Sequence, residues 1–239
     1  MRQLILLAAL PLAACGFAGN DGSGRAQSSG ERAVRDFAAT DFTRVLLRGS
    51  DDVTVAIGDG FKVHAEGPAE EIAELRIEVV DGELRIASDH DRSWSWGSRE
   101  GVRVQVTMPR VEGASISGSG DMDVARAEGD FAGSVSGSGN LVIHAIDAQT
   151  VSLAISGSGD IEADGTAQSL DASVDGSGDI DAEGLTVTQA SVSVSGSGDI
   201  SATVNGNASV SIVGSGDVDL GGDANCTISK SGSGDVSCG

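Results

Sequence analysis

One short phrase, repeated along the C-terminal half of the chain, restricts the possible folds more than any other feature. From Gly118 onward, Gly-Ser-Gly occurs seven times, and each of these copies is followed by Asp or Asn. The first glycines of the copies are Gly118, Gly137, Gly157, Gly176, Gly196, Gly214 and Gly232. A repeat of about 19 residues cannot bury its own apolar face and must stack on its neighbours. The sequence therefore predicts a repeat architecture.

The residues on both sides of the phrase alternate between apolar and polar. Val151, Leu153 and Ile155 precede one copy, with small or polar residues between them. Apolar residues also occupy the first and third positions after each Gly-Ser-Gly-Asp or Gly-Ser-Gly-Asn, as in Met122 and Val124, Leu141 and Ile143, Ile161 and Ala163, Ile180 and Ala182, Ile200 and Ala202, Val218 and Leu220, and Val236 and Cys238. A period of two predicts strands with one buried face.

Short repeats of strands without a helix favour a solenoid. Parallel strands normally need a long crossover, often helical, and a repeat of about 19 residues leaves no room for one. In a solenoid, each turn lays its strands about 4.8 Å from those of the previous turn, so seven turns give a rod of roughly 34 Å. A propeller blade needs about twice as many residues. We expect an all-β parallel β-helix in which Ile161, Ile180 and Ile200 lie one above another.

The residue after each Gly-Ser-Gly forms a column, which we call the aspartate column: Asp121, Asn140, Asp160, Asp179, Asp199, Asp217 and Asp235. Asp and Asn both tolerate turn geometry and bond to nearby backbone, so a turn role is predicted. Hard cations also bind several carboxylates, and calcium on Asp160, Asp179, Asp199 and Asp217 is the alternative. Calcium-binding solenoids repeat every nine residues, however. We therefore expect no cofactor.

The N-terminal segment, residues 1–14, has the features of a secretion signal. Arg2 precedes an apolar run, from Leu4 to Leu12, that is too short to span a membrane. The sequence Leu12-Ala13-Ala14-Cys15-Gly16 resembles the lipobox of bacterial lipoproteins. That resemblance implies cleavage before Cys15, lipidation of Cys15 by several acyl chains such as palmitate, and an outer-membrane location. The alternative is an ordinary signal peptide with an incidental cysteine.

Between the leader and the repeats, the composition changes twice. Residues 15–36 are rich in Gly, Ser and Ala and are expected to form a flexible tether with a reach of about 25 Å. Residues 37–239 are expected to form one domain, with irregular strands over 37–110 and seven coils over 111–239. Within the irregular part we expect a helical turn at 68–73 and a hairpin around Asp81-Gly82.

Several of these elements together resemble a known family. They are the Gly58-Asp59-Gly60 turn, the insertion at 68–73, the Asp81-Gly82 turn, the strand 104–109 and the first Gly-Ser-Gly-Asp at 118–121. In combination they are similar to the putative auto-transporter adhesin, head GIN domain family, over about residues 42–239. The resemblance implies a right-handed parallel β-helix in a bacterial envelope protein, often a lipoprotein, with no established biochemical activity.

The charge of the chain excludes one class of partner. It has 36 acidic and 15 basic residues and a net charge of −21, and loss of the leader with Arg2 would make this −22. Nucleic-acid binding rests on basic residues that neutralise phosphates, so we expect no nucleic-acid partner. With five Phe, two Trp and no Tyr, the core must consist of Val, Ile, Leu and Ala, which suits a narrow β-helix.

Two cysteines near the C-terminus are expected to form a disulfide. By the repeat, Cys226 shares a column with Val151 and Leu170, and Cys238 shares one with Val124 and Ile143, so both should point inward. In an oxidising compartment, a Cys226–Cys238 disulfide would hold the final coil, which has no coil beyond it. Two buried free thiols are the alternative. Lys230 interrupts an apolar column and also marks this coil as terminal.

Evidence for catalysis is weak in this sequence. His64, His90 and His144 lie in separate segments without metal-binding spacing. Serines and aspartates recur with the repeat, whereas a nucleophile needs a unique set of partners with an oriented base. We therefore expect no enzyme activity.

Trp94 and Trp96 are the candidate ligand-binding residues. They lie in the polar run 88–101 and would share a face if that segment is extended, where they could stack on a sugar or a protein. The alternative is that they cover an edge of the solenoid. The predicted function is a membrane-tethered, non-catalytic adhesion module that binds polysaccharide or another envelope protein. A polysaccharide-active β-helix enzyme and a self-associating structural protein of the envelope are the alternatives.

Overall fold

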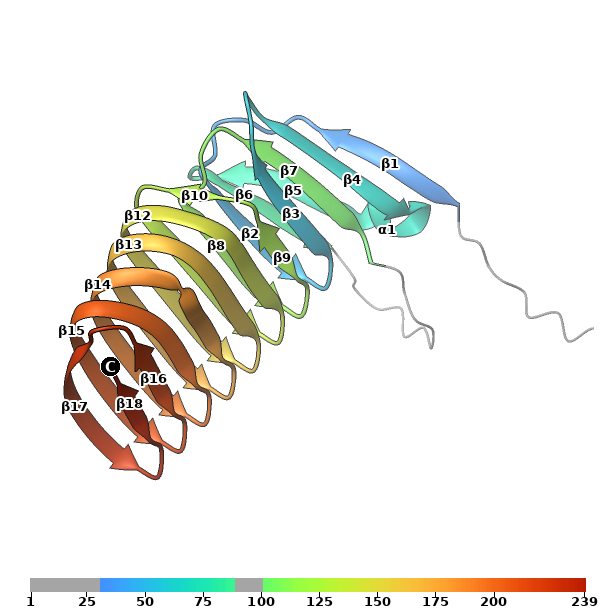
Figure 1. Cartoon of the computed structure of the whole chain (residues 1–239). Coiled ribbons are helices and arrows are strands. Elements are labelled where there is room, and N and C mark those ends of the chain that lie inside the picture. The colour runs from blue at the N-terminus through green and yellow to red at the C-terminus, as the bar shows by residue number, and fades with distance from the viewer. Residues whose placement is uncertain (1–30, 89–100) are drawn as a thin grey trace, which may run out of the picture.

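The computed structural model describes residues 31–88 and 101–239, and in these residues it is a β-solenoid closed at one end by a small cap (Figure 1). The strands along the stack pair in parallel, so the predicted all-β parallel β-helix is confirmed. None of the helices in these two ranges has the length and hydropathy needed to cross a bilayer.

The centre of the stack consists of four long, bent strands, each of which makes most of one coil. They are β12 (Asn140–Gly157), β13 (Asp160–Gly176), β14 (Ile180–Gly196) and β15 (Ile200–Gly214). Their parallel register places Ile161 beside Ile180 and Ile180 beside Ile200, and each of these side chains is 1% exposed. The predicted stacking of equivalent residues is therefore confirmed.

Shorter strands complete the stack on either side of these four. The first Gly-Ser-Gly coil contains β8 (Gly113–Gly118), β9 (Met122–Val124) and β10 (Ala127–Glu128), and β11 (Phe131–Gly137) follows in the next coil. At the other end, β16 (Val218–Gly221) follows β15, and the final coil consists of β17 (Asn225–Gly232) and β18 (Val236–Cys238), since β18 stacks on β16. Each of these coils thus turns at a Gly-Ser-Gly segment, which we call the glycine corner.

Close stacking explains why both corner positions are glycine. Gly157 has a φ of 136°, which a side chain would strain. Gly159 has an ordinary φ, but a Cβ there would lie 2.1 Å from the carbonyl oxygen of Gly139 in the preceding coil. The serine amide of each corner also bonds to the preceding corner, as Ser158 N–H donates to Gly137 O at 2.8 Å. Each corner therefore seats directly on the backbone of the one before it.

The N-terminal part adds two more coils, and their order in space differs from their order in sequence. β2 (Arg44–Gly49) pairs in parallel with both β6 (Glu83–Ser88) and β8. β3 (Asp52–Ile57) pairs in parallel with both β7 (Arg103–Met108) and β9. The coil of β2 and β3 is therefore inserted between the coil of β6 and β7 and the first Gly-Ser-Gly coil.

Antiparallel strands and one helix close this end of the molecule and form the part that we call the cap. β5 (Leu75–Val80) forms the predicted hairpin with β6, and β4 (Lys62–Pro68) pairs antiparallel with β7. The helix α1 (Ala69–Glu74) lies where the helical turn was predicted and joins β4 to β5. Its Ile72 is 4% exposed.

One predicted boundary was wrong. The expected tether extended to residue 36, but β1 (Arg32–Phe37) is a strand that pairs antiparallel with β4, from Arg32 opposite Pro68 to Phe37 opposite Val63. The alternation in β1 is weak and its Val34 is 63% exposed, so pairing with β4 rather than burial gives it strand structure. The folded domain therefore begins by residue 32.

Candidate binding surface

The aspartate column lies on the surface beside the glycine corners and has a structural role. Asp179 N–H donates to Asp160 Oδ1 at 3.0 Å, and Asp199 N–H donates to Asp179 Oδ1 at 2.8 Å. The same bond links Asp217 to Asp199 and Asp235 to Asp217, both at 2.7 Å. Each carboxylate thus accepts the backbone amide of the next coil, so the bond links successive coils, whereas the sequence predicted a bond within the residue's own turn.

The single asparagine interrupts this pattern. Asn140 donates both its backbone N–H and its Nδ2 to Asp121 Oδ1, at 2.9 and 3.0 Å. The following amide, Asp160 N–H, bonds instead to Gly139 O at 3.3 Å. The column therefore holds its register through the backbone even where the side chain differs.

A shallow acidic depression of about 240 Å³ lies between two rows of side chains on the outer surface of the last coils. One row belongs to the aspartate column, and the second row is offset by two residues. The lining residues are Asp179, Asp199 and Asp217 of the first row, Asp181, Ser201 and Asp219 of the second, and Ile180 and Ile200 beneath them. We call this the acidic depression. Sequence reasoning found its first row only.

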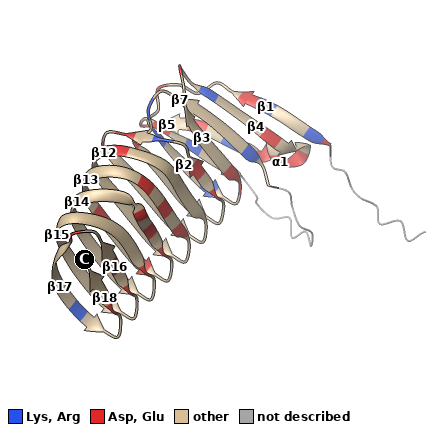
Figure 2. Ribbon diagram, viewed as in Figure 1, with Lys and Arg blue, Asp and Glu red and all other residues tan. Residues whose placement is uncertain are grey.

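The second row became visible only with the register of the strands. Asp181 lies beside Glu162 in one neighbouring coil and beside Ser201 in the other, and Ser201 lies beside Asp219. Figure 2 shows acidic residues in successive coils along this part of the stack. In the sequence, Lys230 is the only Lys or Arg after Arg126, so cations are concentrated near the cap.

No metal site is formed by the side chains of residues 31–88 and 101–239. In these ranges no three His, Cys, Asp or Glu residues are grouped so that they could hold an ion. One oxygen of each bonded carboxylate in the aspartate column already accepts a backbone amide. Calcium on this column stays an alternative that the structure does not test.

His144 lies on the same outer surface, nearer the cap. Its Nε2 is 2.8 Å from Asp123 Oδ2, and its side chain is 53% exposed. The hydrogen bond to Asp123 and the negative charges of Asp123, Glu162 and Asp164 raise the pKa of His144 above 6.5, against a smaller lowering by partial burial. His64 makes a similar pair, with Nδ1 2.7 Å from Asp36 Oδ1, which joins β4 to β1.

Asp51 is a buried carboxylate that the sequence did not single out. It is 1% exposed and occupies the place of the second corner glycine in the coil of β2 and β3. Its Oδ2 accepts the Ser88 hydroxyl, and its Oδ1 accepts Val102 N–H at 3.2 Å. Asp51 therefore joins the end of β6 to the chain just before β7.

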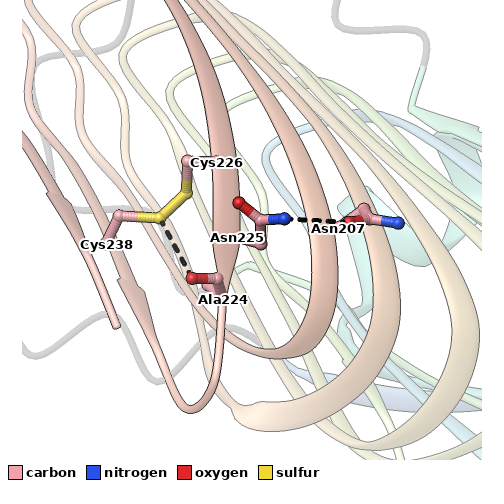
Figure 3. Close-up of a disulfide and its surroundings, with 5 residues drawn as sticks. All are labelled: Asn207, Ala224, Asn225, Cys226 and Cys238. Carbon is pink, nitrogen blue, oxygen red and sulfur yellow. Dashed lines mark hydrogen bonds between the residues drawn. A yellow bond between two sulfur atoms is a disulfide. The ribbon is translucent and has the colours of Figure 1, made fainter.

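The predicted disulfide between Cys226 and Cys238 is present (Figure 3). The Cα atoms are 6.5 Å apart, and Cys226 lies beside Ala208 while Cys238 lies beside Leu220, as the repeat predicted. Cys238 Sγ lies 3.8 Å from Ala224 O, within the same coil. The bond joins both sides of the final coil.

Four of the residues singled out in the sequence lie outside the described residues: Cys15, His90, Trp94 and Trp96. Lipidation of Cys15 and ligand binding by the tryptophans therefore stay predictions.

The comparisons with known proteins agree with this architecture. The family model described as putative auto-transporter adhesin, head GIN domain, matches residues 41–224. The match covers most of the chain, so the protein belongs to this family of adhesin-like β-solenoids. No curated protein matches the chain.

Solved structures with the same fold come from Bacteroides and Parabacteroides species. A putative adhesin from Bacteroides fragilis is 22% identical, with a TM-score of 0.78, and the match covers 87% of this chain and 97% of that one. A putative lipid binding protein from Parabacteroides distasonis is 21% identical, with a TM-score of 0.70 and the same coverage. A putative adhesin from Parabacteroides merdae is 20% identical, with a TM-score of 0.64, and covers 87% and 96% of the two chains. At these identities the likeness concerns the fold.

Proposed function

We propose that this protein is a non-catalytic adhesion module, held at a bacterial membrane by lipid on Cys15, that binds an extended polymer along the side of its solenoid. The observation that carries the proposal is the repetition of the exposed surface. The aspartate column presents carboxylates at equivalent places in consecutive coils, and the second row of the acidic depression adds Asp181 and Asp219, with Ser201 between them. Parallel strands set these groups about 4.8 Å apart, which suits a ligand that is itself repetitive.

The charge of this surface favours neutral or amine-bearing polysaccharides over acidic ones. The side of the last coils contains Asp181, Asp199 and Asp219, and no Lys or Arg lies between residues 127 and 229. Like charges repel, and salt screens such repulsion over about 10 Å at 0.1 M. Membership of an adhesin-like family supports the adhesive role but does not name a ligand.

The ligand proposal is tested by binding to an array of neutral, acidic and amine-bearing polysaccharides. Wild type should bind neutral or amine-bearing polymers, and Asp181→Asn combined with Asp219→Asn should weaken binding to the amine-bearing ones. Asp130→Asn combined with Asp147→Asn changes the charge equally on other exposed residues and serves as the control. Trp94→Ala and Trp96→Ala test the predicted stacking residues separately. Release of reducing sugars from any polymer would contradict a non-catalytic role.

The membrane anchor is tested independently of the ligand. Labelled palmitate supplied to expressing cells should be incorporated into the wild-type protein, and that protein should fractionate with membranes. Cys15→Ser should remove both the label and the membrane association. A wild-type protein without label would contradict the anchor but not the polymer-binding surface.

A further inference from the structure

The far end of the solenoid leaves two strands paired on one side only. β17 pairs with β15 and β18 pairs with β16, and nothing else in the described part of the chain pairs with either. Such an edge offers free N–H and C=O groups to another chain. The apolar interior is also less covered here, because Ile228 is 49% exposed whereas its equivalent Val210 is 1% exposed. This end therefore has the features that favour addition of another coil.

Lys230 is the exception in the column that this added coil would cover. Lys230 pairs with Ile212, and the column above it is apolar and at most 3% exposed throughout: Leu47, Ile116, Val135, Ile155, Val174, Val194 and Ile212. The Lys230 side chain is 38% exposed. Another coil stacked on β17 would have to remove this ammonium group from water, which is unfavourable without a buried partner.

Lys230 also lies beside the acceptor that the next coil would need. Along the aspartate column, the incoming amide donates to Oδ1 of the aspartate in the coil before it, as Asp235 N–H does to Asp217 Oδ1. For a further coil, that acceptor would be Asp235 Oδ1. Lys230 Nζ lies 3.5 Å from this oxygen and donates a hydrogen bond to Gly234 O. The ammonium group therefore competes with an incoming strand at the last corner.

We propose that Lys230 terminates the solenoid and keeps the terminal strands of a second copy of this chain from pairing with β17 and β18. The role is separate from polymer binding, since it concerns the end of the stack and not its side. Inward-pointing charges on edge strands are a general means of preventing such pairing. Lys230 combines this charge with a bond to the final corner.

The test is sedimentation velocity of the full-length chain, with the disulfide intact, over a range of concentrations. Wild type and Lys230→Arg should sediment as monomers. Lys230→Ile and the nearly isosteric Lys230→Met should self-associate, with a dimer dissociation constant at least about tenfold lower than that of wild type, because an apolar residue completes the column. The control is Ser229→Ile, which adds the same side chain at the exposed neighbouring position of β17.

Three results would overturn the proposal. One is a folded, monomeric Lys230→Ile protein at the highest concentration tested. Another is association of Ser229→Ile as strong as that of Lys230→Ile, which would show that any added apolar side chain on β17 causes nonspecific association. The third is association of wild type through the same end, detected by cross-linking between copies of β17. If Lys230→Ile does not give a native circular dichroism spectrum, the result for Lys230→Met decides.

Discussion

At the scale of single residues, the corner of each coil is governed by the space available to one atom. Both corner glycines need room against the previous corner, and the first also needs a positive φ. Periodicity in the sequence identifies both positions. It does not show why each position must be glycine, because the distance from a Cβ to a carbonyl oxygen in another coil depends on the completed stack.

Alanine at the second corner glycine should be far more costly than alanine at an open turn. In Gly159→Ala, the new Cβ would lie 2.1 Å from Gly139 O and 2.8 Å from a Val135 methyl carbon. We expect a loss of at least about 3 kcal/mol in urea unfolding. Gly129→Ala is the control, since its φ is 85° but nothing lies within 4 Å, and about 1–2 kcal/mol is expected. Equal losses would show that corner packing is not limiting.

The His144–Asp123 pair should make stability depend on pH. The folded pKa of His144 is raised above 6.5, so its contribution is complete below pH 6.5 and is lost as the pH rises through the folded pKa. NMR titration should give a pKa above 6.5 in wild type and a lower one in Asp123→Asn. The melting temperature of wild type should fall from pH 6 to pH 8 by more than that of Asp123→Asn. An unchanged pKa in Asp123→Asn would assign the shift to Glu162 and Asp164 instead.

Asp51 shows the limit of reading individual residues from sequence. Its partners, Ser88 and Val102, are 37 and 51 residues away and meet it only because β2 and β3 are inserted beneath β6 and β7. In the sequence it is one of many aspartates close to a Gly-Ser pair. The aspartate column could be predicted because each member repeats, whereas a residue used once could not.

At the scale of elements, the final coil depends on its disulfide more than on burial. β17 is mostly exposed, and a coil with a neighbour on one side has half the stacking of an internal one. The Cys226–Cys238 bond joins two residues that are 12 positions apart in the sequence. By the chain-entropy model, a loop of about 15 residues is stabilised by about 3 kcal/mol.

Reduction of this bond should loosen one end of the molecule only. Hydrogen exchange should accelerate within residues 221–239, while β13 and β14 keep their protection, because solenoid stability is nearly a sum of local terms. Cys226→Ser combined with Cys238→Ser should reproduce the effect without reductant. Uniformly faster exchange over the whole stack would contradict this local role.

Strand existence was largely predictable, whereas strand partners in the N-terminal part were not. The sequence predicted β7 and the hairpin of β5 and β6, because alternation records which face of a strand is buried. It contains no information on neighbours, and β2 pairs with β6 and β8, which both follow much later in the chain. In the repeats, by contrast, the period itself predicts which strand segment each segment pairs with, because it is the one a single repeat away.

At the scale of the whole molecule, the stack should tolerate loss of one complete coil. Deletion of residues 160–178 joins Gly159 to Asp179 and places Ile180 on Leu141, where Ile161 lies in the intact protein. The shortened protein should unfold cooperatively, with a β-type circular dichroism spectrum and a length reduced by about 4.8 Å in small-angle scattering. Deletion of residues 160–173, which removes less than one repeat, should prevent folding. Equal tolerance of both deletions would contradict strict stacking.

The insertion of β2 and β3 between later strands has a consequence for biogenesis. During synthesis these strands emerge before both of their neighbours, so their edges stay unpaired until β9, which ends at Val124, is available. The repeats beyond need only one more period of chain to find a partner, and short separations close fastest. Assembly should therefore nucleate in the middle of the chain and reach the N-terminal cap last, which makes the earliest-emerging segment the one most in need of a chaperone.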